Sequence, residues 1–496
     1  MNAIFSEIFS AISQYQYWLT LFVGVFCGLI LGATPGISAT MSIALLVPFT
    51  FGMDIVQSIT LLIGIYFATI YGGSIPAILF KTPGTPASSA LIFDGYSMTQ
   101  SGKAGKALSI AAVSMLIGAL IGATLLIFAA PYISLIALKF GPAELFAMAS
   151  FGIIVIVSVS DTSLIKGLLS ALAGLLISCI GMDPISGYPR FIFGCTSLME
   201  GVPFIPVLIG LFAISGALMS KTTATNFSNV KVKFCELPPK KDVKKTLPTI
   251  IKSGFLGTFI GSAPGAGCDI ASFVSYGIAK YGASKDDKFG KGEIKGIAAV
   301  ESAKSACTSG ALIPLLSLGI PGDAVTAILV GAFILHGIQP GPLLFENHAP
   351  LTGVIFTTVV LAHIFVFAVA MLTVKWSILV LKVDERFIKA TVLILAMVGS
   401  FALRNNMIDV YIAFIFGIVG ILMQKGQFPV APFLLALILG QMAEVNFRRA
   451  LMLSDGSISF ILNTPIALGI LLVAITFFIL GMIKRLRKTK NNNLTV

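Results

Sequence analysis

Five ionisable residues lie within or beside apolar segments that are rich in glycine and proline. They are Lys81, Asp269, Glu301, Lys304 and Asp323. Charged groups are costly to bury in such surroundings and usually serve a function there. A buried ammonium or carboxylate can hold an ion of opposite charge or carry a proton. We therefore take Asp269, Glu301, Lys304 and Asp323 as ion-coupling candidates, and Lys81 as a candidate for binding an anion.

The segments that carry these charges contain two glycine-proline patterns, and each pattern occurs twice. Gly28-x3-Gly32-x2-Pro35-Gly36 returns in the second half of the chain as Gly257-x3-Gly261-x2-Pro264-Gly265. Gly72-x3-Pro76-x6-Pro83-Gly84 returns as Gly310-x3-Pro314-x6-Pro321-Gly322. Within each pattern, every paired position is shifted by the same offset. Proline and glycine interrupt helices. Paired interruptions in two halves of a chain indicate the binding site of a membrane transporter.

An interrupted helix can bind ions of either sign. Its exposed N–H groups and partial positive charge suit a carboxylate, and its free carbonyls suit a cation. Small hydroxyl side chains beside the interruption can add hydrogen bonds. The substrate-binding candidates are Thr34, Pro35, Gly36, Ser38, Lys81, Pro83, Gly84, Thr85, Ser88, Pro264, Gly265, Ser309, Pro321, Gly322 and Thr326. For any single serine or threonine, the alternative interpretation is helix packing by a small residue.

The composition indicates that these segments lie in lipid. Of 496 residues, 56% are hydrophobic and 11% are charged, against about 25% charged in soluble domains. Many apolar runs reach the roughly 20 residues that cross a bilayer as a helix. We therefore expect an all-α polytopic membrane protein with about 11–12 transmembrane segments. The N-terminus lacks the features of a cleaved signal peptide.

The net charge of +12 is concentrated in short basic stretches. Such stretches mark cytoplasmic loops, and no folded basic surface for nucleic acid is evident. The six cysteines are scattered, with no spacing typical of a metal site or a disulfide framework. The chain also lacks a nucleotide-binding glycine loop and a nucleophile-base signature. We expect no enzyme activity and no cofactor or metal other than Na⁺ or H⁺ as a coupling ion.

The repeats and basic stretches predict four parts. Residues 1–220 form a first repeat, with a re-entrant hairpin (17–50), a broken helix (56–95) and scaffold helices (107–219). Residues 221–252 form a basic cytoplasmic linker, and residues 484–496 a basic cytoplasmic tail. Residues 253–483 form a second repeat, with a hairpin (253–279), a broken helix (297–345) and scaffold helices (351–483).

The distribution of Lys and Arg also predicts orientation. Basic sequence flanks the second hairpin on both sides, whereas residues 1–16 and 52–57 around the first hairpin have none. The two hairpins should therefore enter the membrane from opposite faces, which makes the repeats inverted. We expect the N-terminus in the periplasm and the C-terminus in the cytoplasm.

Long motifs in both halves resemble those of a known family. They include Gly72-Gly73-Ser74-Ile75-Pro76, Pro83-Gly84-Thr85-Pro86-Ala87, Leu318-Gly319-Ile320-Pro321-Gly322 and His336-Gly337-Ile338-Gln339-Pro340. The chain resembles TctA, the large membrane subunit of the tripartite tricarboxylate transporters, over nearly its whole length. The resemblance implies a bacterial inner-membrane secondary transporter for carboxylates, driven by a cation gradient, commonly sodium. It also implies a small four-helix membrane subunit and a periplasmic substrate-binding protein as partners. By analogy we expect a homodimer and an elevator-like movement.

The charged candidates differ in how they fit this family. Glu301 matches the family pattern, whereas Lys81, Asp269, Lys304 and Asp323 depart from it. One hypothesis is that Lys304, alone or with Lys81, replaces a bound sodium ion, that Asp269 or Asp323 supplies the counter-charge, and that one of these four groups carries a transported proton. A second is that the lysines pair with a more highly charged anionic substrate. A third is that the charges form internal salt bridges in a relative that does not transport. An anion channel or a non-transporting sensor or structural subunit is the alternative function.

Overall fold

The computed structural model describes residues 2–34, 37–159, 163–219, 237–265, 267–284, 286–380, 385–458 and 460–492. These residues are helical throughout, apart from loops and one short antiparallel pair of strands, β1 (Gly181–Met182) and β2 (Pro189–Arg190). The predicted all-α class is confirmed.

Among the described residues, six helical segments are long and apolar enough to cross a membrane. They are Tyr15–Ala33, Ile55–Phe80, Ala104–Ala137, Ala349–Leu372, Met407–Lys425 and Val430–Leu453. Six is fewer than the expected 11–12, because that estimate also counted shorter apolar helices such as Pro142–Ser158 and Leu164–Ser178. The length and hydropathy of these segments agree with the polytopic membrane protein predicted from the sequence.

The first part of the chain forms a helical hairpin and then an interrupted helix. Its elements are α1 (Asn2–Ser13), α2 (Tyr15–Ala33), α3 (Ala39–Leu46), η1 (Val47–Thr50), α4 (Ile55–Gly72), α5 (Ser74–Phe80), η2 (Pro86–Ile92) and α6 (Gly95–Gln100). The following helices are α7 (Ala104–Ala137), α8 (Pro142–Val159), α9 (Leu164–Ser178), η3 (Thr196–Leu198), α10 (Phe204–Leu208), η4 (Ile209–Ile214) and α11 (Ser215–Met219).

The second part repeats this order. Its elements are α12 (Lys240–Ser262), α13 (Gly267–Tyr281), α14 (Ile294–Leu318), α15 (Ala324–Leu335) and α16 (Pro342–Asn347), followed by α17 (Ala349–Val380), α18 (Glu385–Arg404), α19 (Met407–Lys425), α20 (Val430–Leu453), α21 (Phe460–Asn463) and α22 (Pro465–Asn492). Helix α12 begins at Lys240, so residues 240–252 of the expected linker form the start of the second hairpin. Residues 221–236 of that linker lie outside the described residues.

Equivalent glycines make equivalent helix crossings in the two parts. A Cβ added to Gly28 or Gly32 on α2 would collide with α4 at Ile65 or Thr69. A Cβ added to Gly257 or Gly261 on α12 would collide with α14 at Ala303 or Cys307, the positions related by the same offsets. Small residues allow the two backbones to approach closely. The repeated sequence pattern therefore produces the same close crossing twice.

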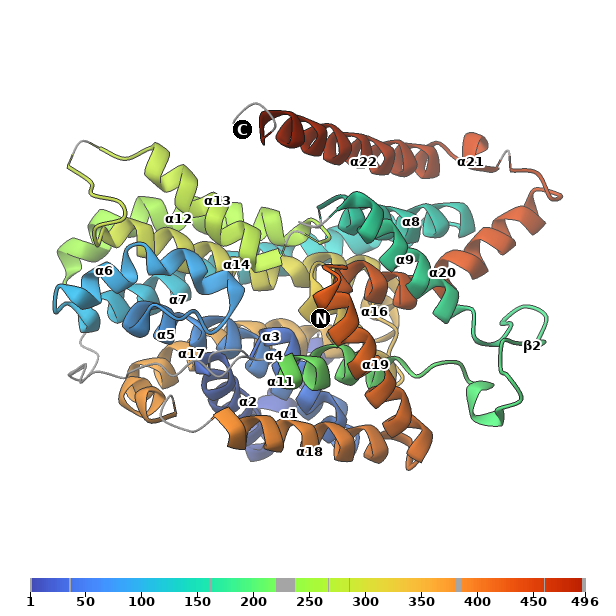
Figure 1. Ribbon diagram of the computed structural model, residues 1–496, viewed down its shortest axis with the longest axis horizontal. Coiled ribbons are helices and arrows are strands. Elements are labelled where there is room, and N and C mark those ends of the chain that lie inside the picture. Colours follow the sequence, from blue (N-terminus) through green and yellow to red (C-terminus); the bar gives the residue numbers. More distant parts are fainter. Residues whose placement is uncertain are drawn as a thin grey trace.

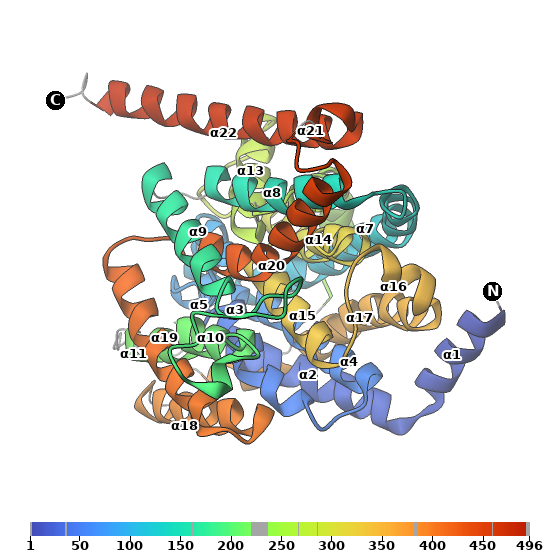
Figure 2. The ribbon, with the colours of Figure 1, turned by 90° about the vertical axis from the view of Figure 1, so that its right-hand side faces the viewer.

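The broken helices of the two parts meet, since α14 and α15 both contact α4. Helix α14 contacts α7, α12 and α13, and α12 and α13 lie side by side along one edge of the molecule (Figure 1). Helix α20 packs against α8 and α9, whereas α22 runs along the outside of the molecule over α8 (Figure 2). The α14 face that carries the charged candidates is therefore enclosed by other helices.

Candidate functional site

The first break comprises residues 81–85, between α5 and η2. Helix α5 ends at Lys81, which adopts the left-handed conformation with φ 62°. The loop then folds back, because the Gly84 N–H donates to the Gly73 carbonyl at 3.1 Å. A side chain on Gly84 would collide with the Gly32 carbonyl at the end of α2. The first break therefore packs directly against the last turn of α2.

The second break comprises residues 319–323, between α14 and α15. It has the same construction, since Gly319 ends α14 with φ 73° at the position equivalent to Lys81. The Gly265 N–H, at the tip of the second hairpin, donates to the Gly322 carbonyl at 2.7 Å. Gly265 has φ 84°, a conformation that favours glycine. The second break is thus joined to the second hairpin tip.

Lys304 on α14 is fully buried and reaches into the first half of the chain. Its Nζ donates to the Ile70 carbonyl at 3.1 Å, to the Ser88 hydroxyl at 3.0 Å and to the Ser74 hydroxyl. The Glu301 carboxylate, also fully buried, lies 3.2 Å from the same nitrogen. An ammonium has three hydrogens to donate. Its partners occupy all of them, so Lys304 has no donor left for a substrate in this conformation.

Glu301, and not Asp269 or Asp323 as the first hypothesis had it, supplies the negative charge beside Lys304. It lies one helical turn before Lys304 on α14, and its Oε1 makes the ion pair. Neither carboxylate oxygen makes a hydrogen bond of normal geometry among the described residues, so the contact with Lys304 is an ion pair. Two fully buried charges are costly to remove from water, and their mutual attraction offsets that cost only when the geometry is good.

Asp323 forms a second cluster at the start of α15. Its carboxylate accepts from the Thr326 N–H at 2.8 Å, and the Thr326 hydroxyl completes a capping box with the Asp323 N–H. The Tyr66 hydroxyl on α4 donates to the other carboxylate oxygen at 2.7 Å. Asp323 is therefore an N-cap whose second oxygen is bound from the other half of the chain.

The two clusters are related by the repeat. The offset that takes Gly72 to Gly310 also takes Tyr66 to Lys304 and Ser88 to Thr326. Tyr66 crosses from the first half to the second break, and Lys304 crosses from the second half to the first break. At the first break, the residue that reaches across from the other half, Lys304, is charged. At the second break, Tyr66 reaches across and is neutral, and the residue that it contacts, Asp323, is charged.

The remaining candidates have other surroundings, although Thr85 and Pro321 adjoin the two clusters. Lys81 and Asp269 are exposed. Thr34 donates to the Ile30 carbonyl, Ser38 caps α3, and Ser309 shares a hydrogen bond of 3.1 Å with His363. Pro83 is half-buried, while Pro264 and Pro321 are buried. Thr85, which is buried, shares a hydrogen bond of 3.0 Å with Ser88. Pro35 and Gly36 lie outside the described residues.

The structure adds contact residues that the sequence interpretation did not select. They are Tyr66, Ile70 through its carbonyl, Ser74 and His363. Tyr66 could have been found by applying the repeat offset to Lys304, and Ser74 lies inside the repeated pattern. His363 stacks on Phe67, with ring centroids 3.9 Å apart, and no sequence signal connects it to Ser309.

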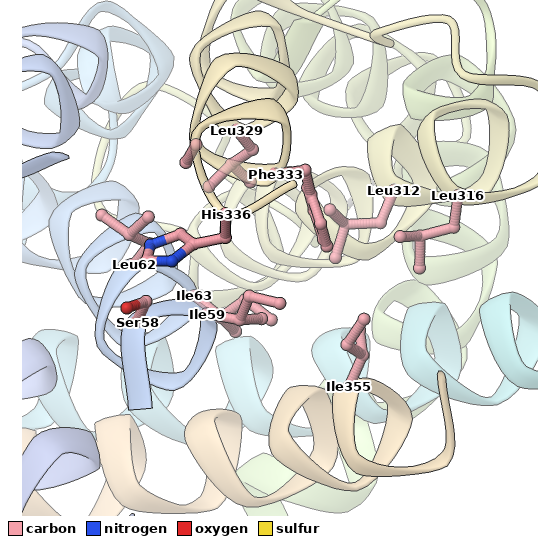
Figure 3. Close-up of a pocket in the computed structure, with 11 residues that line it drawn as sticks. Ser58, Ile59, Leu62, Ile63, Leu312, Leu316, Leu329, Phe333, His336 and Ile355 are labelled. Carbon is pink, nitrogen blue, oxygen red and sulfur yellow. The ribbon is translucent and has the colours of Figure 1, made fainter. Parts of the chain in front are cut away.

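An apolar cavity lies away from both clusters. It is lined mainly by aliphatic side chains of α4, α14 and α15, among them Leu62, Leu312 and Leu329 (Figure 3). Ser58 and His336 are its polar lining residues. A cavity of this composition does not suit a carboxylate, so it is not our candidate for the substrate site.

Comparison with known proteins fits this arrangement. A family model described as "Tripartite tricarboxylate transporter TctA family" matches residues 18–435. The chain belongs to this family. A relative from Agrobacterium vitis, described as "Uncharacterized 52.8 kDa protein in TAR-I ttuC' 3'region", is 34% identical over 471 residues, 95% of this chain and 94% of the relative. Another from the same organism, "Uncharacterized protein in TAR-II ttuC' 3'region", is 34% identical over 236 residues, 47% of this chain and 97% of the relative. No solved structure matches.

Membership of the TctA family confirms the resemblance found in the sequence. The chain is a multi-pass membrane subunit of a tripartite transporter, which has other subunits. The region that matches the TctA model contains both breaks and both hairpin tips, and it ends before α22.

Proposed function

We propose that this TctA subunit imports small carboxylates, tricarboxylates, dicarboxylates or related organic anions, by cation-coupled symport across the bacterial inner membrane. The main support is the pair of equivalent helix breaks, of which the first packs against Gly32 and the second bonds to Gly265. Broken helices of this kind present polar backbone groups where a membrane protein binds its cargo.

The anion is expected at the first break, because the two breaks differ in charge. Lys81 is exposed at the first break, whereas Asp323 caps the helix after the second break. Asp269 lies in the first turn of α13, just after the second hairpin tip. A carboxylate is attracted by the first arrangement and repelled by the second. Gly84 contacts Gly32, so Thr34 and Ser38 of the first hairpin tip belong to the same proposed site.

Alternating access is proposed to occur by an elevator-like movement of inverted repeats. The equivalent glycine crossings support two equivalent units, and the basic stretches support their opposite orientation. With this orientation the proposed N-terminus is periplasmic and the proposed C-terminus is cytoplasmic. Labelling of single cysteines near each terminus in intact cells tests the orientation, and labelling of both termini from the same side would contradict it.

The proposed partners are a small four-helix membrane subunit, a periplasmic substrate-binding protein and a second copy of this chain. Family membership supports the existence of further subunits. Co-expression with the candidate subunits, followed by purification through a tag on this chain, should recover them in fixed stoichiometry. Recovery of this chain alone as a monomer would contradict the proposed assembly.

Uptake into proteoliposomes that contain the assembled transporter tests the function itself. Labelled citrate and smaller carboxylates should accumulate against their gradients when a cation gradient is imposed. Lys81→Met should raise the KM with little effect on folding, and Lys139→Met, which changes another exposed lysine, should leave the KM unchanged. Equilibration without accumulation would favour an anion channel, and binding without flux would favour a sensor.

A further inference from the structure

We infer that the Lys304 ammonium is a built-in replacement for a monovalent cation at the first break. The inference deepens the proposed function and rests on it, because a cation-coupled symporter would bind its coupling ion among such ligands. The Lys304 charge belongs to the chain itself, so it moves with the protein and is never released. The first break would then not bind sodium during transport.

The atoms around the Lys304 nitrogen are those that a hard monovalent cation takes. They are a backbone carbonyl, two hydroxyl oxygens and a carboxylate oxygen, from Ile70, Ser74, Ser88 and Glu301. Hard cations prefer oxygen ligands, and rings of backbone carbonyls replace their hydration shells in channels. The Ile70 carbonyl also lies in the last turn of α4, where the helix dipole is negative.

An ordinary structural ion pair would not explain this arrangement. Glu301 and Lys304 lie on the same helix, but the ammonium makes its hydrogen bonds to the other half of the chain. The repeat does not demand a charge there, since Tyr66 makes the equivalent crossing contact with a neutral hydroxyl. The positive charge is thus specific to the first break, where Glu301 and the polar oxygens would otherwise form an anionic, oxygen-lined site.

Shortening Lys304 should convert this site into one that needs a free cation. In Lys304→Ser the carboxylate, the Ile70 carbonyl and the hydroxyls of Ser74 and Ser88 remain, but the ammonium and its stem are gone. A small monovalent cation then has both room and ligands. In Lys304→Met the stem remains and fills the space with an apolar group, so the charge is lost without leaving a cation site.

The test is the thermal unfolding of the purified full-length chain in detergent, in sodium, lithium, potassium or choline chloride at equal ionic strength. Wild type should show no difference between sodium and choline. Lys304→Ser should unfold at a lower temperature than wild type in choline, and one of the metal salts should restore its unfolding temperature. That temperature should rise with the logarithm of the metal concentration. Lys304→Met should be destabilised in every salt.

Lys139→Asn, a change to an exposed lysine outside both breaks, serves as the control and should show no salt-specific shift. Two results would overturn the inference: an equal metal-specific shift in wild type, or a Lys304→Ser protein that no metal ion stabilises over choline. If Lys304→Ser is not recovered from membranes, Lys304→Asn is measured in the same way. Failure to recover either variant in any metal salt also overturns the inference, because the ion should replace the ammonium. No substrate is needed, so this result is separate from that of the uptake assay.

Discussion

Replacing Glu301 with glutamine removes the counter-charge of a fully buried ammonium while keeping the shape of the side chain. The charges are 3.2 Å apart and neither side chain is exposed. At an effective dielectric constant of about 20, their attraction is about 5 kcal/mol. Breaking a buried pair by removing one partner typically costs about 3–5 kcal/mol. We therefore expect Glu301→Gln to lower the free energy of unfolding by about 3–5 kcal/mol.

The assay is denaturant unfolding of the purified protein in mixed micelles, followed by intrinsic fluorescence. Glu200→Gln serves as the control, because Glu200 pairs with Arg404 at 2.9 Å but is 79% exposed. Its loss should cost less than about 1 kcal/mol. Glu301→Gln combined with Lys304→Met removes both charges and should recover part of the lost stability. A loss below about 1 kcal/mol for Glu301→Gln alone, or a double variant less stable than the single, would refute the reasoning.

Three further predictions concern the second break and the loop between α13 and α14. Gly322→Ala should lower the thermal unfolding temperature and reduce uptake, because its Cβ would lie 2.7 Å from the Gly261 carbonyl and the Ala311 Cα. Gly277→Ala is the control: a Cβ there meets nothing within 4 Å, so this variant should be slightly more stable in the same thermal assay. Tyr66→Phe should cost about 1.5–3 kcal/mol in denaturant unfolding, because it removes a hydrogen bond to a buried carboxylate; a cost near zero would contradict that role. The Lys295 ammonium, with Ser284, holds the pKa of Asp287 below its ordinary value of 3.8, so Asp287 stabilises the fold above that pH and the contribution is lost as the pH falls below it. Thermal unfolding from pH 7 to pH 3 should therefore show a smaller loss in Asp287→Asn than in wild type, and equal losses would contradict the assignment.

The breaks could be predicted from the sequence because their signals are local. Glycine and proline restrict or free the backbone where they occur, and a constant offset within each pattern aligns the two copies. Lys304 and Glu301 could be selected because charges are rare in apolar segments. The family resemblance, carried by the same motifs, is confirmed by the TctA match.

The pairing of the charged candidates could not be predicted in the same way. Lys304 contacts Ser88, which is far away in the sequence, because α14 lies against the first half of the chain. That proximity depends on how the two halves pack, which no local pattern encodes. For the same reason, nothing in the sequence separated Lys304, which is enclosed, from Lys81 and Asp269, which are exposed. The structure thus encloses Lys304 among hydrogen-bond partners and leaves Lys81 exposed.

The reciprocal contacts of Tyr66 and Lys304 have a consequence for the evolution of the chain. Each half completes the other half's break, and the residues that do so are no longer the same. Two copies of the first half would lack the ammonium, and two copies of the second half would face each other with two lysines and two aspartates. The two halves are therefore no longer interchangeable, since each needs contact residues that only the other supplies.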